Sequence, residues 1–323
     1  METYRTRASV DAGPRPLVRA RQRRAKPVPT FSIVIPTLNE GAMLRMTVES
    51  AAQHADGADY EVLVVDDGST DGSTEIYKQP GDPRVRLIRG GALGVARARN
   101  LGARHARGDC LIFMDAHCKV SYGWLRGFAD LLSIPGVGLG GPCFRKLETP
   151  MPRGCGMRWP DYRLDPCWFE PLNGVDVYSV PLTTGACQAF HRDTFEALGR
   201  YDAGFTRWGF EDVEMCLRAW LFGYQVAVHP GITIAHYFRE ARDNYEVDDT
   251  EITCNFLRMV YLHFRPTRIQ QVLQAAKGNP FLATAQERLA ESDVFERRAE
   301  LFARRVRDDE WFFQEVNGVI GVA

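Results

Sequence analysis

The chain has 323 residues, which is long enough for one large domain or for one domain with appendages. Hydrophobic residues make up 45% of it and the formal net charge is −1. This composition is typical of a globular protein with a sizeable core, and it gives no overall attraction to nucleic acid or to an anionic membrane. No apolar stretch is long enough to span a bilayer and the N-terminus lacks the apolar core of a signal peptide, so we expect a cytoplasmic protein without a nucleic-acid partner.

The first 29 residues are rich in arginine and proline and have almost no apolar periodicity. We predict that residues 1–29 form a disordered basic tail. A basic arm that binds an anionic partner is the alternative, although runs of charge are usually only solvated.

Between residues 31 and 114, short apolar runs alternate with segments of helical spacing. The predicted strands are 31–36, 60–65, 85–88 and 111–114, and the predicted helices are 42–54, 71–78 and 95–107. Because right-handed crossovers join strands that alternate with helices, we predict an α/β fold with a Rossmann-like, mainly parallel central sheet flanked by helices. The strand ends would place several polar residues on one rim, namely Thr37, Asp66, Asp67 and Asp115.

Residues from about 141 to 182 show little periodicity, which is typical of long functional loops on an α/β scaffold. The aromatic residues of this segment could cover a sugar or an acceptor, or pack a small core of the loop itself; they include Trp159, Tyr162, Trp168 and Phe169. Further strands are predicted at 183–190, 225–229 and 232–236, and a helix at 211–222. Gly185, in the first of these strands, would permit close approach of the backbone to a ligand.

Residues 265–323 are helical in pattern, with amphipathic arginine-rich stretches at 284–307. We expect a main domain over residues 30–264 and a helical C-terminal extension over 265–323. The extension carries no recognisable chemistry. A lid, a homodimer contact and a helical buttress are the alternatives for its role.

The eight cysteines are scattered along the chain without a Cys-x-x-Cys pair, so we expect reduced thiols. Cys143, Cys155 and Cys167 are evenly spaced, but they lack the close ligand pairs of structural zinc sites.

A carboxylate and an imidazole stand two residues apart directly after the apolar run Cys110–Met114. At the carboxyl end of a strand, Asp115 and His117 would point the same way and could hold one divalent ion. The carboxylate suits Mn²⁺ or Mg²⁺, and the imidazole favours Mn²⁺. His236 ends a later predicted strand and is a candidate third ligand; the alternative for a lone histidine is an ordinary packed or exposed side chain.

Two further groups of residues are candidates for binding a nucleotide. Asp66 and Asp67 could accept hydrogen bonds from a nucleobase or a ribose, although Asp-Gly-Ser is also good turn chemistry. Arg97 and Arg99 lie in a helix opened by Gly94, and helix N-termini and arginines both suit phosphate.

The first predicted strand is followed by Pro36-Thr37-Leu38-Asn39-Glu40, and not by Gly-x-Gly-x-x-Gly. This argues against a nicotinamide-dependent dehydrogenase. A phosphate-loop motif is also absent from the sequence, and the missing glycine-rich loop argues against a sugar nucleotidyltransferase.

Two carboxylates, Glu211 and Asp212, open the predicted helix 211–222. Asp212 could act as a general base, because a helix N-terminus keeps a carboxylate ionised. The alternative is that both residues only complement the helix dipole, with an ordinary Glu214–Arg218 pair behind them. Trp208, just before the helix, could help to form an apolar platform for a sugar or an acceptor.

Together these motifs resemble glycosyltransferases of the GT-A fold, especially family-2 enzymes. The resemblance covers residues 31 to about 240. It rests on the segments 32–40 (SIVIPTLNE), 64–71 (VVDDGSTD) and 98–102 (ARNLG) and on the Asp115-Ala116-His117 motif.

A second resemblance is to the polypeptide N-acetylgalactosaminyltransferases, through the segments 94–99 (GVARAR), 113–118 (FMDAHC), 208–211 (WGFE) and 236–239 (HYFR). It implies that Asp115, His117 and His236 bind Mn²⁺, which grips the diphosphate of UDP, and that Asp66 lies by the nucleoside. The animal enzymes of this family also have a membrane anchor and a lectin domain, which we do not find in this sequence. Their Trp-Gly-Gly-Glu-Asn becomes Trp208-Gly209-Phe210-Glu211-Asp212 here, and an Asp after the Glu resembles the catalytic base of inverting family-2 enzymes.

The sequence thus predicts a glycosyltransferase that depends on Mn²⁺ or Mg²⁺ and moves a sugar from a nucleotide sugar, most simply a UDP-sugar, to a hydroxyl or thiol with inversion. Asp212 and Glu211 are the predicted catalytic residues. The predicted donor-binding residues are Thr37, Asn39, Glu40, Asp66, Asp67, Arg97, Arg99, Asp115, Gly185, Trp208 and Arg239.

Two alternatives stay open. One is a retaining transferase that glycosylates Ser or Thr of a peptide, and the other is a non-catalytic nucleotide-binding protein on the same fold. The acceptor could be a peptide, a small natural product or a saccharide, because a fold does not fix the substrate.

Overall fold

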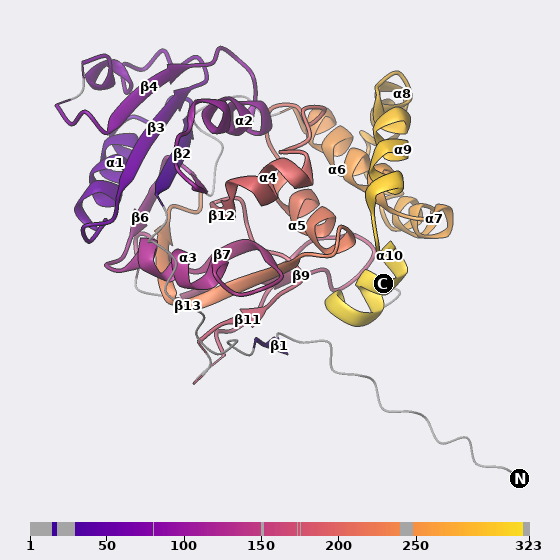
Figure 1. Ribbon diagram of the computed structural model, residues 1–323. Helices are drawn as coiled ribbons and strands as arrows, with labels where there is room; N and C mark the ends of the chain where they lie inside the picture. Colours follow the sequence, from indigo (N-terminus) through magenta and orange to yellow (C-terminus); the bar gives the residue numbers. More distant parts are fainter. Residues whose placement is uncertain are drawn as a thin grey trace, which may run out of the picture.

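The computed structural model describes residues 15–17, 30–79, 81–149, 152–172, 174, 176–239 and 248–318. Its main sheet has the strand order β1-β11-β13-β7-β12-β5-β2-β3-β4, and helices cover both faces of it (Figure 1). The predicted α/β fold with a central sheet flanked by helices is confirmed.

Four parallel strands build the first half of the sheet, and each ends at the same edge. They are β2 (Phe31–Thr37), β3 (Tyr60–Asp66), β4 (Val85–Arg89) and β5 (Cys110–Met114). The connections between them contain α1 (Ala42–Gln53), the short 3-10 helix η1 (Glu75–Tyr77) and α2 (Val95–His105). The predicted elements are found here, except that the expected helix over 71–78 is reduced to η1.

The second half of the sheet differs more from the predictions. The strand expected at 183–190 begins only at Cys187, as β12 (Cys187–His191), and it runs antiparallel between β5 and β7. β7 (Val137–Lys146) was not predicted, because its glycines and proline hide the strand pattern. The two strands predicted at 225–229 and 232–236 form one strand, β13 (Gln225–His236), with a register shift between His229 and Thr233. β13 lies parallel to β7 and also pairs with β6 (Cys118–Val120).

The apolar residues of the sheet pack into two hydrophobic cores, one on each face of the sheet. Alternate residues of β2 show this directly, since Ile33 and Ile35 face one core while Val34 faces the other. The first core packs against α1 and α3 (Trp124–Leu132). The second packs against α2, α4 (Arg192–Leu198), α5 (Glu211–Leu221) and α6 (Asp249–His263).

A buried ionic group anchors α5 to its neighbours. Glu214 accepts hydrogen bonds from Arg218 and contacts His263 Nε2 of α6 at 2.6 Å, and all three side chains are fully buried. The Glu214–Arg218 pair, expected as an ordinary helix contact, is therefore present, and it is buried. Burial would raise the pKa of Glu214, but Arg218 and His263 outweigh it and lower the pKa to about 2. Because removing one partner would leave a buried charge unpaired, this group fixes the place of α5.

The segment that lacks periodicity contains four short strands, β8 (Pro152–Gly154), β9 (Met157–Arg158), β10 (Cys167–Trp168) and β11 (Tyr178–Ser179). Trp159 is 1% exposed and packs against Phe264, Phe312 and Phe313, so this residue serves the core. Trp168 instead contacts Phe238, near the end of β13.

A disulfide joins Cys143 of β7 to Cys155 after β8. The expectation that all cysteines are reduced is wrong for this pair. Spacing along the chain did not indicate the bond, because β8 turns back antiparallel on β7 and brings together residues twelve positions apart. The other six cysteines are free thiols.

Both ends of the described chain contact the sheet or its helices. Arg15–Pro16 form β1, which pairs antiparallel with β11; the rest of the predicted tail at 1–29 lies outside the described residues. At the other end, α6 is followed by α7 (Pro266–Ala275), α8 (Leu282–Ala290), α9 (Val294–Arg304) and α10 (Asp309–Phe312).

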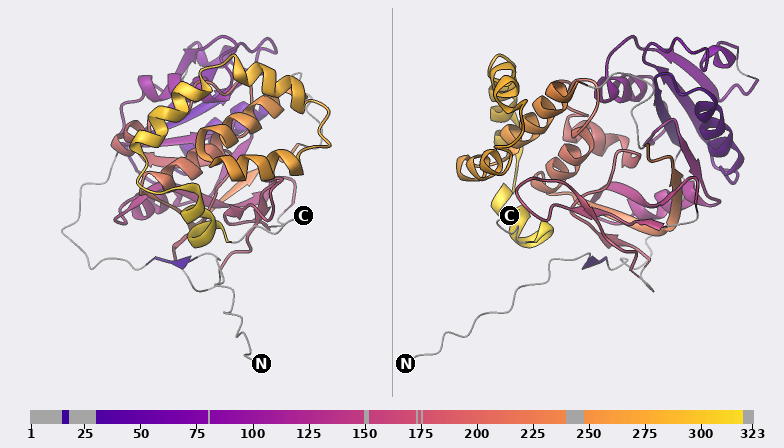
Figure 2. Two further views of the ribbon diagram at one scale, coloured as in Figure 1. Left: turned by 90° about the vertical axis from the view of Figure 1, so that its right-hand side faces the viewer. Right: turned by 180° about the vertical axis from the view of Figure 1, so that it is seen from behind.

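The helices α6 to α9 gather on one side of the molecule, away from β2, β3 and β4 (Figures 1 and 2). The domain boundaries at residues 29 and 264 and a homodimer through the C-terminal helices stay predictions. Within the residues that the structure describes, no helix has the length and apolar character needed to cross a membrane.

We predict that denatured, unreduced protein exposes the six free thiols and that reduction exposes all eight cysteines. Replacing Cys143 and Cys155 together by Ser should lower the free energy of unfolding by about 2–3 kcal/mol, the value typical of a short disulfide loop. Thiol titration and urea denaturation measure the two effects, with Cys254→Ser as the control. Eight titratable thiols before reduction would contradict the disulfide.

Candidate metal and donor site

Three side chains from separate places in the sequence meet at the carboxyl edge of the sheet. Asp115 follows β5, His117 lies two residues on, and His236 ends β13. One ligand atom from each lies within 4.8 Å of the others. The imidazole rings are 4.7 Å apart between centroids, and His236 Nε2 lies 3.5 Å from Asp115 Oδ2. The structure therefore brings together the three predicted metal ligands.

The state of these groups fits a divalent cation. His236 is 8% exposed, and neither of its ring nitrogens has a hydrogen-bond partner among the described residues. Burial lowers the pKa of His236, although Asp115 opposes the shift, so the neutral form that ligates metal is favoured. Burial would raise the pKa of Asp115, but His236, Arg99 and His117 outweigh it and hold the pKa well below its usual range. One anionic oxygen ligand beside two imidazoles suits Mn²⁺.

A second layer of residues orients His117. Glu40 Oε2 lies 3.2 Å from His117 Nδ1, and the same oxygen accepts a hydrogen bond from Arg239. A carboxylate on one ring nitrogen sets the tautomer and leaves the other nitrogen for a metal. Glu40 and Arg239, both predicted to bind the donor, thus lie directly beside the metal ligands.

Arg99 is the buried centre of the site. Its side chain is 2% exposed and donates to Glu211 Oε1 at 2.8 Å, to Asp115 Oδ1 at 3.1 Å and to the Gly185 carbonyl at 2.8 Å. Asp115 follows β5, Gly185 precedes β12 and Glu211 opens α5. Arg99 therefore ties the metal ligand to the predicted catalytic carboxylates, and its contact with a donor stays a prediction.

Asp212 and Glu211 lie at the first turn of α5, as predicted. Asp212 accepts backbone hydrogen bonds from Gly185 N at 2.6 Å and Val213 N at 2.8 Å. Burial raises the pKa of Asp212, and burial together with Asp212 raises the pKa of Glu211 despite the ion pair with Arg99. A side chain on Gly185 would collide with Asp212 and Arg99, since an added Cβ would lie 2.8 Å from Asp212 Cβ. Gly185 thus permits close packing inside the protein, and its approach to a ligand stays a prediction.

The carboxylates after β3 are occupied by protein groups. Asp66 accepts four hydrogen bonds, and the partners are Gly68 N, Ser69 N, Thr74 Oγ1 and Arg89 Nη1. Asp67 accepts from Leu93 N at 2.6 Å and from Gly94 N at 2.9 Å, which fixes the loop that opens α2. The turn alternative therefore describes Asp66, whereas Asp67 holds the loop before α2, and a contact of either residue with a nucleoside stays a prediction.

The remaining predicted donor residues are Thr37, Asn39, Arg97 and Trp208. Thr37 and Asn39 lie on the same rim; Asn39 Oδ1 accepts from Thr70 N at 2.8 Å, and Thr37 Oγ1 is buried without a partner among the described residues. Arg97 is exposed and donates to the Ala203 carbonyl at 2.7 Å. Two residues apart on a helix, Arg97 and Arg99 point to opposite sides, so the structure does not bring Arg97 to the metal ligands. Trp208 is 45% exposed in the loop before α5.

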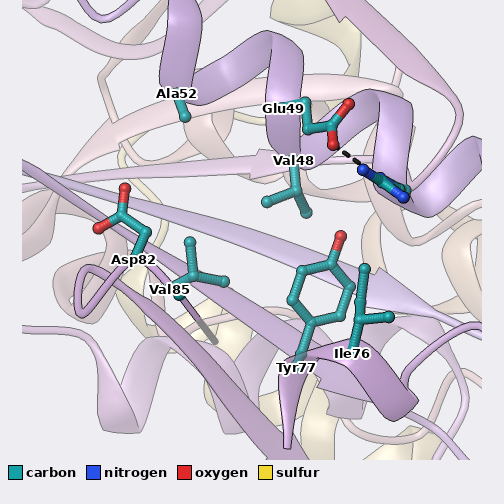
Figure 3. A pocket seen from close by; sticks show the side chains of 9 residues that line it. Val48, Glu49, Ala52, Ile76, Tyr77, Asp82 and Val85 are labelled. Atoms are coloured by element: carbon teal, nitrogen blue, oxygen red, sulfur yellow. Dashed lines mark hydrogen bonds and ion pairs between the residues drawn. The ribbon is translucent and has the colours of Figure 1, made fainter. Parts of the chain in front are cut away.

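A cavity of about 350 Å³ lies elsewhere, between α1, η1 and β4 (Figure 3). Val48, Tyr77 and Val85 line it, and so do Arg45 and Glu49, which form an ion pair. None of the predicted site residues lines this cavity. It is therefore separate from the metal ligands.

Comparison with known proteins gives the family of the chain. The family described as glycosyl transferase family 2 matches residues 32–199. The chain belongs to glycosyl transferase family 2. A second family, described as the N-terminal domain of galactosyltransferase, matches residues 177–242. The two matches together include β2 to β5, α5 and the end of β13, which carry the predicted metal ligands and catalytic carboxylates.

Individual relatives of this family-2 chain include a polypeptide N-acetylgalactosaminyltransferase 11 from Xenopus tropicalis, 32% identical over 67% of the chain. An inactive polypeptide N-acetylgalactosaminyltransferase-like protein 5 from Mus musculus is 28% identical over 79% of the chain. The chain spans 39% of the length of the first relative and 62% of the second.

Among solved structures, the crystal structure of GalNAc-T7 with UDP, GalNAc and Mn²⁺ superposes with a TM-score of 0.74. The superposition covers 90% of this chain and 57% of the GalNAc-T7 chain, and the two sequences are 21% identical. A mannosyltransferase from Pyrobaculum calidifontis, in complex with GDP-Man and Mn²⁺, superposes with a TM-score of 0.52 at 20% identity. These likenesses confirm the predicted GT-A type of fold.

We predict that His236→Ala weakens Mn²⁺ binding by about 1–3 kcal/mol, the scale of one lost contact to a charged group. Isothermal titration calorimetry with Mn²⁺ measures the change. His191→Ala is the control, since His191 lies at the opposite end of β12 from the site and pairs with Cys110. Equal Mn²⁺ affinities for the wild type and His236→Ala would remove His236 from the ligand set.

Proposed function

We propose that this protein transfers a sugar from a nucleotide sugar, with UDP as the favoured nucleotide, to an acceptor hydroxyl or thiol with the help of Mn²⁺. The convergence of Asp115, His117 and His236 at the carboxyl edge of the sheet carries this proposal. The comparisons add support, since the GalNAc-T7 structure contains UDP and Mn²⁺. An oxygen ligand with two imidazoles agrees with the same ion.

The metal, when bound, neutralises the diphosphate and stabilises it as a leaving group. The protein groups around it have separate tasks. Glu40 holds the His117 ring in the ligating tautomer. Arg239 is 20% exposed beside Glu40, so its guanidinium can donate to a phosphate oxygen at the same edge.

We assign Asp212 as the general base that deprotonates the acceptor. Its side chain is half-buried at the N-terminus of α5, and the burial that raises its pKa brings the carboxylate closer to the range of an effective base. Attack from the face opposite the leaving group would then invert the anomeric centre. The backbone hydrogen bonds from Gly185 and Val213 hold the carboxylate in one orientation.

A retaining transfer to a peptide is the second candidate, and the names of the relatives support its peptide acceptor. The curated relatives include polypeptide N-acetylgalactosaminyltransferases, and the match to the Xenopus tropicalis protein covers 67% of this chain. One relative is described as inactive, so a non-catalytic nucleotide-binding protein is a third outcome that an assay must separate.

The cellular compartment belongs to the same proposal. The sequence favours the cytoplasm, whereas the Cys143–Cys155 disulfide favours an oxidising compartment, because cytosolic thiols are kept reduced. Of the two, we propose the oxidising compartment. The protein is isolated from its native source with its free thiols alkylated, and the thiols that later reduction releases are titrated; release of the Cys143 and Cys155 thiols supports this choice.

The test of the function is a panel of UDP-, GDP- and dTDP-sugars incubated with Mn²⁺, with and without peptide, saccharide and thiol acceptors. Proton NMR follows the sugar that is released or transferred. We expect selective consumption of one UDP-sugar, and the first-formed anomer reports inversion or retention. UDP binding that depends on Mn²⁺, without consumption of any donor or acceptor, would support a non-catalytic nucleotide-binding protein.

Replacing Asp212 by Asn should abolish transfer and leave Mn²⁺-dependent UDP binding near normal, because Asn keeps the shape of the side chain but cannot accept the proton. Asn also gives up one of the two backbone hydrogen bonds from Gly185 and Val213. Transfer rates and calorimetric UDP affinities measure the two quantities. Asp202→Asn is the control, since Asp202 is a buried carboxylate that pairs with Arg258 away from the metal ligands. If Asp212→Asn keeps transfer and the product retains its configuration, the base assignment is wrong and the retaining candidate takes its place.

A further inference from the structure

The loop that leads into α5 has an unusual backbone. Arg207, Gly209 and Phe210 all have positive φ angles, of 49°, 108° and 70°. Two of these residues carry side chains, for which the left-handed region is unfavourable and persists only when surrounding contacts impose it. Because Phe210 directly precedes Glu211 and Asp212, the contacts that impose this loop also decide where the two carboxylates lie.

One side chain makes several of those contacts. Asn255 of α6 is 1% exposed, and its amide nitrogen donates to the Thr206 carbonyl at 2.7 Å and to the Trp208 carbonyl at 3.1 Å. Its amide oxygen accepts from Thr206 N at 3.0 Å. Both amide hydrogens and the oxygen of Asn255 therefore form hydrogen bonds with two residues of the loop. A buried amide without hydrogen-bond partners lowers the stability of the folded protein. The contacts therefore hold both the Asn255 side chain and the loop in place.

Two residues near Asn255 on α6 contact two other residues of the loop, Arg207 and Phe210. Glu251 lies 3.4 Å from Arg207 as an ion pair, and the Phe256 ring lies 5.4 Å from the Phe210 ring. Glu251 and Asn255 are four residues apart, which places them on one face of the helix.

The opposite side of the loop rests on the start of α2. Val95 N donates to the Arg207 carbonyl at 2.8 Å. Gly94 allows this approach, since a Cβ there would lie 2.7 Å from Arg207 N. The loop is thus held between α2 and α6, and Asn255 supplies its side-chain hydrogen bonds from α6.

We propose that Asn255 is a positioning residue for sugar transfer, and this inference rests on the proposed function. By holding the backbone at Thr206 and Trp208, Asn255 places the exposed Trp208 side chain and sets the start of α5 with Asp212. The metal ligands are attached to β5 and β13 and not to this loop; among the described residues, Arg99 is the side chain that links one of them, Asp115, to Glu211. Loss of Asn255 should therefore impair transfer without weakening Mn²⁺ binding.

The chain provides a matched control. Asn317 makes the same kind of contact with Trp159, accepting from its backbone N–H at 2.9 Å and donating to its carbonyl at 2.9 Å. Asn317 is also 1% exposed, but it fixes a core tryptophan rather than the loop before α5. Asn255→Ala and Asn317→Ala therefore remove equivalent buried amides, and only the first touches the Trp208 loop.

The experiment uses protein labelled with 5-fluorotryptophan, whose six tryptophans give separate fluorine NMR signals. Trp208→Phe assigns the Trp208 signal. Asn255→Ala should shift or broaden that signal, whereas Asn317→Ala should leave it in place. With the donor and acceptor found active for the wild type, Asn255→Ala should lower kcat/KM by about tenfold to a hundredfold, the range expected for misplaced catalytic groups. The loss should fall mainly on kcat, with the Mn²⁺ affinity unchanged.

Several results would overturn the inference. If Asn255→Ala has a wild-type kcat/KM and an unmoved Trp208 signal, Asn255 has no positioning role. A loss of kcat/KM that Asn317→Ala matches would reduce the effect to general destabilisation. Should Asn255→Ala not fold, Glu251→Gln acts on the same loop from a less buried position and should move the Trp208 signal in a milder way. Absence of turnover by the wild type would instead refute the proposed function, and the Trp208 signal would still decide whether Asn255 holds the loop.

Discussion

The architecture of the site depends on one buried positive charge, the guanidinium of Arg99. Transfer of an unpaired charge into a protein interior is strongly unfavourable, so Arg99 needs anionic partners close by. It finds Asp115 and Glu211, which come from segments almost a hundred residues apart in the sequence, together with the Gly185 carbonyl. The same pairing lets several acidic groups lie near one another without a prohibitive repulsion. Asp115, a proposed metal ligand, and Glu211, next to the proposed base, are therefore joined by a single side chain.

Around this centre, the other contacts restrict motion rather than supply chemistry. Glu40 and Arg239 fix His117 from the outside, and Asp67 fixes the loop that opens α2. Farther out, Asn255 and the buried Glu214–Arg218–His263 group hold the loop and the helix that carry Asp212. Groups that are held before a substrate binds need little reorganisation during the reaction, which is the usual basis of electrostatic stabilisation in enzymes. The helix α6 contributes directly to this restraint, so it is more than a cover for the core.

Several parts of the fold were accessible from the pattern of residues. The strands β2, β3, β4 and β5 are short apolar runs closed by polar residues, and the rule that parallel strands end at one edge places Thr37, Asp66 and Asp115 together. The pattern failed at β7, where Gly138, Gly140 and Gly141 obscure the strand. It also failed for the Cys143–Cys155 bond, which depends on the return of β8 against β7. Little in the sequence indicates the position of Asn255 beside the Trp208 loop, because it stands as a single polar residue among Cys254, Phe256 and Leu257.

By itself the sequence determined the residue types of the site and their attachment to strand ends, because local periodicity sets strand positions and ligand chemistry follows from side-chain type. It specified Asp115, His117 and His236 as candidate ligands and Asp212 as a candidate base. Tertiary structure alone decided which candidates share one space. It placed Arg99 inward and Arg97 outward, and it paired Asp66 with the turn after β3 and Asp67 with the loop before α2. Such outcomes depend on contacts between segments far apart in the chain, and no local pattern encodes the distance between them.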